Sequence, residues 1–258
     1  MIYAGIDAGS RAIKVVLLEA PSGRIVASAL ADQGVEQDKL AAGLYHRLLS
    51  ENGLRESDVA RTVATGYGRA IVSIAHTTVT EITCHAAGVR RLAADARTVI
   101  DIGGQDSKLL HLDAAGKVRD FAMNDRCAAG TGRFLEIVAD RLGVQLADLG
   151  RLAKQSRQPA HISSMCVVFA ETEIIGLLAS GAMPADIVAG VMHAIAGRTA
   201  AMAGHAVDGP VVFTGGVALV PGMDKALAET LDREVHICPS PQFTGALGAA
   251  ILAANHKD

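Results

Sequence analysis

Short apolar runs bounded by turn residues alternate along this chain with segments whose apolar residues recur every three or four positions. The first pattern is typical of buried strands and the second of amphipathic helices. The predicted strands are residues 2–6, 13–19, 24–29, 59–65, 98–102, 108–112, 118–123, 211–214 and 234–237. The predicted helices are residues 38–51, 81–92, 134–142, 146–154, 173–178, 187–203, 223–231 and 244–254. Strands followed by helices, twice over, favour two similar α/β lobes with a cleft between them.

The two halves of the chain open on copies of one short segment. Residues 6–14 (IDAGSRAIK) align without a gap with residues 100–108 (IDIGGQDSK). In each copy an apolar run ends in an aspartate, a glycine turn follows, and a second apolar run begins near a lysine. The matched pairs are Asp7 with Asp101, Gly9 with Gly103, and Lys14 with Lys108. The repeat predicts a strand, a tight turn and a second strand, used twice.

Such turns are suited to binding phosphate, because glycine lets backbone N–H groups approach phosphate oxygens closely. An aspartate at a strand end can hold Mg²⁺ directly or through water. We therefore expect Asp7 and Asp101 to hold Mg²⁺ on a nucleotide polyphosphate, with Gln105, followed by Asp106, orienting an attacking water. The residues predicted to bind the nucleotide here are Gly9, Ser10, Arg11, Lys14, Gly103 and Gly104. The alternative is a structural hairpin that was duplicated without a ligand.

A third glycine pair, Gly215-Gly216, follows the apolar run 211–214. A buried strand that delivers a glycine turn at its carboxyl end favours backbone packing against an adenine or ribose, although a plain strand-to-helix turn has the same pattern. The chain has no Walker A lysine loop, which excludes a P-loop fold.

The three glycine motifs together resemble those of the actin–Hsp70–sugar kinase (acetate and sugar kinase) superfamily. In that superfamily they are the two phosphate motifs and the adenosine motif. The resemblance implies an α/β protein of two ribonuclease-H-like lobes with ATP and Mg²⁺ in the interlobe cleft. We place lobe I at residues 1–95, completed by a C-terminal helix at 244–258, and lobe II at residues 96–243.

Composition narrows the class of partner. The 258 residues suffice for two lobes, and half are apolar, but aromatic residues make up 3% and Trp is absent, so small aliphatic side chains must fill the core. The 24 basic and 27 acidic residues give a formal charge of −3 without a basic stripe, which argues against a nucleic-acid partner. No apolar run is long enough to cross a bilayer and no signal-peptide pattern opens the sequence, so we expect a cytoplasmic protein without a membrane partner.

The four cysteines are Cys84, Cys127, Cys166 and Cys238. Cys127 and Cys166 each lie in a segment that leads into a predicted helix, where the positive end of the helix dipole favours a thiolate. An iron–sulfur cube normally takes four thiolates. Two such cysteines would complete that set only in a homodimer about a two-fold axis. The alternative is that lone cysteines are small buried hydrophobes, which suits Cys84 and Cys238 well.

Four segments resemble the BadF/BadG/BcrA/BcrD-type ATPases, the family of 2-hydroxyacyl-CoA dehydratase activators and benzoyl-CoA reductase ATPase subunits. They are residues 101–108, 124–136 (NDRCAAGTGRFLE), 166–173 (CVVFAETE) and 242–250 (QFTGALGAA). The likeness covers essentially the whole chain. It implies a homodimer, or a heterodimer of related subunits, that holds one bridging [4Fe-4S] cluster through Cys127 and Cys166. We also place Gly130 and Thr131 among the cofactor-binding residues.

The function that this resemblance implies is ATP hydrolysis coupled to one-electron transfer at very low potential. The partner would be a 2-hydroxyacyl-CoA dehydratase, and a ferredoxin or flavodoxin would supply the electron. The alternatives are an ATPase subunit of a benzoyl-CoA reductase-type or related double-cluster reductase and a small-metabolite kinase of the same superfamily. A non-catalytic nucleotide sensor is a further alternative, and it would bind ATP without turnover and without iron.

Overall fold

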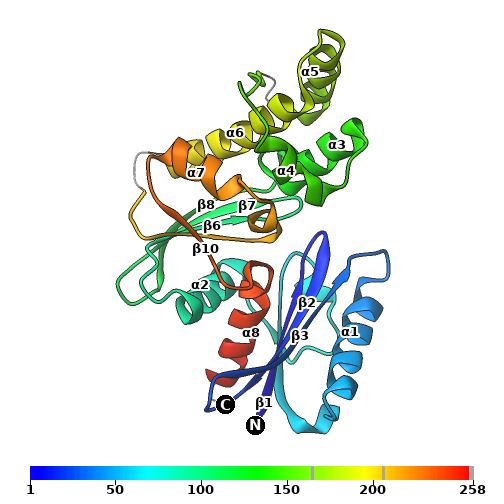
Figure 1. The fold of residues 1–258 in the computed structure, drawn as a ribbon. Coiled ribbons are helices and arrows are strands. Elements are labelled where there is room, and N and C mark those ends of the chain that lie inside the picture. The colour runs from blue at the N-terminus through cyan, green and yellow to red at the C-terminus, as the bar shows by residue number, and fades with distance from the viewer. Residues whose placement is uncertain (164–165, 205–206, 256–258) are drawn as a thin grey trace. The chain divides into compact units, whose positions relative to one another are not determined.

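The computed structural model describes residues 1–163, 166–204 and 207–255 (Figure 1). Residues 256–258 of the predicted C-terminal helix lie outside the described residues. The chain divides into two compact units. Unit 1 comprises Met1–Ala96, Leu112–Arg119 and Gln242–Asp258, and unit 2 comprises Arg97–His111 and Asp120–Pro241.

Unit 1 is built on a five-stranded sheet with the order β3-β2-β1-β4-β5. Strand β1 pairs antiparallel with β2, as a hairpin requires, and parallel with β4. The strands are β1 (Ile2–Ala8), β2 (Ala12–Glu19), β3 (Arg24–Asp32), β4 (Val59–Thr65) and β5 (Thr77–Thr78). The helices are α1 (Gln37–Glu51), α2 (Glu81–Leu92) and α8 (Thr244–Asn255), which joins this unit from the far end of the chain.

Side chains alternate between the two faces of the sheet along β1 and β2, and this alternation determines which helix packs against each face. Ile6, Ile13 and Val15 point to one face and pack with Leu44 and Tyr45 of α1. The next residues along β2, Val16 and Leu18, point to the other face and pack with Ala246 and Leu247 of α8. Helices α1 and α8 accordingly cover opposite faces (Figure 1). By the same alternation, Asp7 and Lys14 project on the face that α8 covers.

Unit 2 contains a second five-stranded sheet with the order β10-β9-β6-β7-β8. With β6 matched to β1, this is the strand order of unit 1 again, because β6 pairs antiparallel with β7 and parallel with β9. The strands are β6 (Thr98–Ile102), β7 (Ser107–Leu112), β8 (Val118–Asn124), β9 (Val211–Thr214) and β10 (Val235–Ile237). The duplication predicted from the two short segments is therefore present in the topology of the sheets.

The helices of unit 2 gather on one face of its sheet (Figure 1). They are α3 (Gly132–Leu142), α4 (Leu149–Ala153), α5 (Val167–Ala179), α6 (Pro184–Ala203) and α7 (Met223–Leu231). Ile100, Ile102 and Leu109 of the sheet pack with Phe134 and Val191 of these helices in one apolar core. Since Asp101 and Lys108 alternate with those core residues along β6 and β7, they point to the opposite face of the sheet.

Most predicted elements are confirmed to within two residues at their ends. Strand β3 runs three residues beyond the predicted strand 24–29, and α6 begins three residues before the predicted helix 187–203. Two other predicted helices differ more. The predicted helix 173–178 is the second half of α5, which begins at Val167. The predicted helix 146–154 is a 3₁₀ turn, η4 (Leu146–Asp148), followed by the short α4. The two-residue strand β5 was not predicted. Among the described residues, no helix has both the length and the apolar character needed to cross a membrane.

Helices α2 and α8 pack backbone to backbone through glycines. A Cβ on Gly88 would lie 2.0 Å from the carbonyl oxygen of Thr244, and one on Gly248 would lie 1.7 Å from that of Cys84. A Cβ on Gly5 of β1 would lie 2.0 Å from the carbonyl oxygen of Ala246. Three glycines thus fix the position of α8 against the strand and the helix beside it.

We expect Gly248→Ala to lower the free energy of unfolding by at least about 2 kcal/mol, because the methyl group cannot fit without moving α2 or α8. Gly43 of α1 is the matched control, since nothing lies within 4 Å of its Cβ position. There, Gly43→Ala should raise the free energy of unfolding by about 0.5–1 kcal/mol. Urea denaturation followed by circular dichroism measures both changes. Equal effects of the two substitutions would contradict this packing.

Candidate functional site

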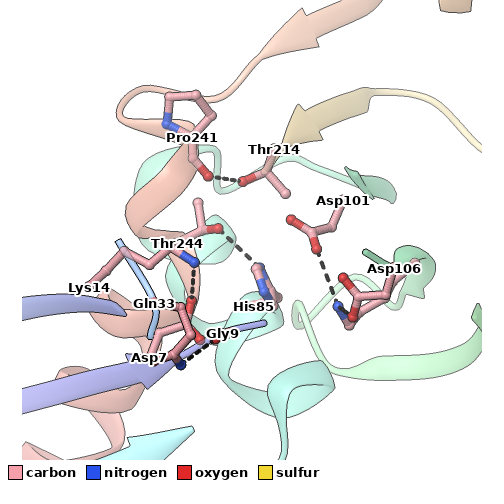
Figure 2. Close-up of polar contacts among 11 residues, drawn as sticks. Asp7, Gly9, Lys14, Gln33, His85, Asp101, Asp106, Thr214, Pro241 and Thr244 are labelled. Carbon is pink, nitrogen blue, oxygen red and sulfur yellow. Dashed lines mark hydrogen bonds and ion pairs between the residues drawn. The ribbon is translucent and has the colours of Figure 1, made fainter. Parts of the chain in front are cut away.

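The first hairpin brings Asp7 and Lys14 together as a cross-strand pair. The Lys14 Nζ donates to Asp7 Oδ2 at 3.1 Å, and both side chains are largely buried. Glycine backbone surrounds the carboxylate, since a Cβ on Gly66 would lie 2.5 Å from Asp7 Oδ1 and one on Gly245 would lie 3.3 Å from Asp7 Oδ2. The predicted phosphate loop therefore carries a carboxylate whose position is fixed by a cation and by adjacent backbone (Figure 2).

Two hydrogen bonds hold the turn of this hairpin, one within the turn and one from a side chain outside it. The Gly9 N–H donates to the Ala12 carbonyl at 3.1 Å, which closes the turn. The Gln33 side chain donates from Nε2 to the Gly9 carbonyl at 2.8 Å (Figure 2). Arg11 is exposed and forms an ion pair with Asp32 at 3.8 Å. Gln33 was not among the predicted site residues, because no local pattern distinguishes it.

The second hairpin repeats the first. Asp101 pairs with Lys108 across β6 and β7, with Nζ and Oδ2 3.5 Å apart, and the Gly103 N–H closes the turn on the Asp106 carbonyl at 2.9 Å. Lys108 Nζ also donates to Asp106 Oδ2 at 2.5 Å (Figure 2). Lys108 and Asp101 are almost fully buried, whereas Gln105 at the tip of the turn is exposed. Removing one member of so buried a pair typically costs about 3–5 kcal/mol of stability.

The third glycine motif lies beside the second hairpin in unit 2. Gly215 has a φ of 89°, a conformation that favours glycine, and its N–H donates to the Pro241 carbonyl at 2.9 Å. A Cβ on Gly215 would lie 2.4 Å from the carbonyl oxygen of Ile102 and 2.8 Å from Asp101 Oδ1. Thr214 Oγ1 donates to the same Pro241 carbonyl at 2.6 Å (Figure 2). Gly215 and Asp101 are therefore neighbours, and Gly216 is exposed.

The N-terminus of α3 is hydrogen-bonded directly to the second glycine turn. The Gly132 N–H donates to the Gly103 carbonyl at 2.9 Å, and the Arg133 N–H donates to the Gly104 carbonyl at 2.8 Å. Thr131 is the N-cap of α3, with its buried hydroxyl accepting from the Arg133 N–H at 3.3 Å. The carbonyl groups of the turn are thus used to anchor the segment that carries Cys127.

The sequence predicts that Cys127 lies close to the N-terminus of the following helix. In the structure Cys127 is separated from α3. The 3₁₀ turn η3 (Ala128–Gly130) lies between them, and an exchange of two hydrogen bonds with the Asn124 side chain fixes the Cys127 backbone. Cys166, by contrast, is the N-cap of α5. Cys127 is half-buried and Cys166 is exposed, next to Val168 and Phe169, which are also exposed.

Cys84 and Cys238 are buried thiols. Burial raises the pKa of Cys84 to about 12 and that of Cys238 to about 11, because a thiolate is poorly solvated among apolar side chains. The description of these two cysteines as small core residues is consistent with this burial. Among the described residues, no group of three or more His, Cys, Asp and Glu side chains is arranged to hold a metal ion.

The sequence did not predict that a histidine and a threonine lie near Asp7. His85 of α2 and Thr244 of α8 are both buried, and His85 Nδ1 lies 3.0 Å from Thr244 Oγ1 (Figure 2). The nearest sequence signal is the small-residue segment 242–250, which marks a closely packed helix but does not identify its partner.

Comparison with protein families and curated proteins gives matches along nearly the full length. The BadF/BadG/BcrA/BcrD ATPase family matches residues 4–253. The activator of lactoyl-CoA dehydratase from Anaerotignum propionicum is 43% identical over 255 residues, which cover 98% of this chain and 97% of that protein. A benzoyl-CoA reductase subunit from Thauera aromatica is 36% identical over 264 residues, covering 98% of this chain and 93% of that protein.

Solved structures agree in fold. The activator of the 2-hydroxyisocaproyl-CoA dehydratase from Clostridium difficile with bound ADPNP is 41% identical, with a TM-score of 0.93 over 99% of this chain and 95% of that one. A ROK family glucokinase from Streptomyces griseus, 15% identical with a TM-score of 0.60 over 99% of this chain and 100% of that one, shares the fold alone. The fold class predicted from the sequence is confirmed.

The environments of the four cysteines predict that their thiols differ in reactivity. We expect iodoacetamide at pH 8 to modify Cys127 and Cys166, because both thiols have access to solvent. Cys84 and Cys238 should react only after unfolding, since their raised pKa values keep them protonated and burial keeps them inaccessible. Mass spectrometry of the digested protein measures each site. Modification of Cys84 in the folded protein as fast as Cys166 would contradict these environments.

Proposed function

Because the chain belongs to the BadF/BadG/BcrA/BcrD ATPase family, we propose that it is an ATP-dependent activator of a 2-hydroxyacyl-CoA dehydratase. The family inferred from the sequence is confirmed by the match over residues 4–253. The observation that carries the proposal is the similarity to dehydratase activators along nearly the whole chain. The activator of lactoyl-CoA dehydratase is 43% identical. The chain would hydrolyse ATP and deliver single electrons at very low potential to the partner enzyme.

The two hairpins are the proposed sites of contact with the nucleotide phosphates. The N–H groups of Gly9 and Gly103 are used to close their turns. Phosphate contacts therefore fall to the residues that follow, Ser10 with Arg11 in the first turn and Gly104 with Gln105 in the second. Lys14 would neutralise phosphate charge beside Asp7, and the backbone of Gly215-Gly216 would pack against the adenosine. The relative that was solved with ADPNP shares this fold at a TM-score of 0.93.

Hydrolysis of ATP at this site would depend on positioning and charge neutralisation rather than on covalent chemistry of the protein. Asp7 and Asp101 would hold Mg²⁺, which when bound neutralises charge on the polyphosphate. Gln105 is exposed at the tip of its turn, a position from which it would orient the attacking water. Gly130 and Thr131 would act more indirectly, because the Thr131 cap fixes the α3 segment that holds Gly103 and Gly104.

Cys127 and Cys166 are the proposed ligands of a [4Fe-4S] cluster. They fit that group by donor type and by access, whereas the buried thiols of Cys84 and Cys238 do not. One chain supplies two such thiols, so a second copy of the chain, or a related protein, would supply the other two. When bound, the cluster supplies the electron that the partner enzyme receives. A ferredoxin or flavodoxin is the proposed source of that electron.

The hydrogen bonds between the second glycine turn and α3 support coupling between nucleotide and cysteine. Gly104 contacts the nucleotide in this proposal. Its carbonyl accepts from the Arg133 N–H, and the carbonyl of Gly103 beside it accepts from the Gly132 N–H. A displacement of the turn on hydrolysis would therefore move the start of α3, five residues beyond Cys127 in the sequence. In this way ATP turnover would alter the environment on which a cluster potential depends.

A second candidate is the ATPase component of a benzoyl-CoA reductase. The 36% identity to the Thauera aromatica reductase component favours it over a small-metabolite kinase, with which the similarity is in fold alone. Adding the reduced chain and ATP to each class of partner separates the two proposals, because only the true partner becomes active. Phosphate transfer to a metabolite instead of to water would indicate the kinase.

Anaerobic purification with iron and sulfide analysis tests the proposal. We expect one [4Fe-4S] cluster for every two chains, and we expect Cys127→Ala and Cys166→Ala each to abolish visible absorbance, because each removes half the thiolates. Both variants should still be stabilised thermally by ADP with Mg²⁺, which the proposal assigns to the hairpins.

Cys238→Ala is the matched control, since that thiol is buried at the end of β10 and should leave the absorbance unchanged. Visible absorbance that survives Cys127→Ala would refute the ligand assignment. A colourless, monomeric protein that does not bind ATP under anaerobic conditions would refute the proposed function.

A further inference from the structure

A buried polar contact joins the two helices that flank Asp7. His85 of α2 is 7% exposed, Thr244 at the first position of α8 is fully buried, and His85 Nδ1 lies 3.0 Å from Thr244 Oγ1. The two residues are 159 positions apart in the sequence, so the contact exists only in the folded unit. A buried hydroxyl and a buried imidazole are costly to place in a core unless they bond to something, and here they bond to each other.

Asp7 lies near the first turn of α8 as well. The position of a Cβ on Gly245 is 3.3 Å from His85 Nε2 and also 3.3 Å from Asp7 Oδ2. The imidazole and the carboxylate therefore both lie beside Gly245, a residue that has no side chain. Figure 2 shows His85, Thr244 and Asp7 gathered at this point. Each of the three belongs to unit 1.

Close backbone contacts at three glycines restrict movement of the chain around His85, Thr244 and Asp7. Gly88, one helical turn beyond His85 on α2, packs against the Thr244 carbonyl, and Gly248 of α8 packs against the Cys84 carbonyl. Gly66 lies against the opposite oxygen of the Asp7 carboxylate. The close glycine contacts thus fix the backbones of α2 and α8, which carry His85 and Thr244. Of the two ring nitrogens of His85, Nδ1 lies by the Thr244 hydroxyl and Nε2 lies near Gly245.

We propose that His85 is a positioning residue for the ATPase reaction, which fixes Asp7 and the first turn of α8 relative to each other. This inference rests on the proposed function, in which Asp7 holds Mg²⁺. His85 does not touch the nucleotide in this account. It acts through Asp7, in the way that groups behind a metal ligand orient that ligand. Thr244 is its structural partner and sets the orientation of the ring.

Two amide substitutions separate the two nitrogens of the ring. The amide of Asn occupies about the position of Nδ1, so His85→Asn retains a partner for Thr244 but removes the nitrogen near Gly245. The amide of Gln reaches about the position of Nε2, so His85→Gln does the reverse. Thr244→Val removes the hydroxyl without a change of shape. His111→Asn is the matched control, because His111 of β7 is a buried histidine of unit 2 outside the proposed site.

The measurements are the half-saturating Mg²⁺ concentration of ATP hydrolysis, kcat, and the rise in Tm that ADP with Mg²⁺ produces, all on the full-length protein. For His85→Asn we expect half-saturating Mg²⁺ to rise about 10-fold or more, because the groups that orient metal ligands contribute about 10–100-fold. His85→Gln should show a smaller rise, and Thr244→Val an intermediate one. Substitutions at His85 and Thr244 should be non-additive, since they disturb one contact.

His111→Asn should lower the Tm of the ligand-free protein without changing the Mg²⁺ dependence, as expected for a histidine whose role is structural. If His85→Asn behaves like His111→Asn, with half-saturating Mg²⁺ within about twofold of the unsubstituted protein, the positioning role is overturned and the proposed function stands. If ADP with Mg²⁺ does not stabilise the unsubstituted protein at all, the proposed function fails and the role of His85 fails with it.

Discussion

The structure depends on one interaction used twice, the pairing of an aspartate at the end of one strand with a lysine across the hairpin. Asp7 with Lys14 and Asp101 with Lys108 occupy the same register in the two sheets. A carboxylate at such a position would be costly to bury alone, and the lysine beside it offsets part of that cost. Each pair is followed by a glycine turn that the N–H of Gly9 or Gly103 closes.

Other residues of each unit pack against the aspartate–lysine pair or hydrogen-bond to the turn that follows it. In unit 1, the Gln33 side chain bonds to the turn. Gly66, just after β4, and Gly245 of α8 bring backbone against the two oxygens of Asp7. In unit 2, Gly215 lies against Asp101, and the start of α3 is bonded to the turn itself. The second unit thereby connects its hairpin to the segment that carries Cys127. In the first unit, the contact between His85 of α2 and Thr244 of α8 lies near Asp7 of the hairpin instead.

Much of the fold was accessible from the sequence because strands and helices leave periodic apolar patterns, and because the ungapped repeat placed Asp7 and Asp101 in equivalent hairpins. Three features were not accessible. The start of α5 at Val167 was missed because two valines and a phenylalanine favour strands locally, and packing overrides that preference. The turn η3 after Cys127 has no periodic signal. The contact between His85 and Thr244 joins residues 159 positions apart, and close glycine packing between helices sets it.

In the proposed function both carboxylates serve one magnesium nucleotide, and calorimetric titration of ADP with and without Mg²⁺ tests this most directly. Asp7→Asn and Asp101→Asn should each weaken binding about tenfold or more in the presence of Mg²⁺, and much less in its absence. Asp113→Asn, at an exposed turn outside both hairpins, should change neither value. If either hairpin variant binds the magnesium nucleotide as tightly as the unsubstituted protein, the duplicated site does not work as described.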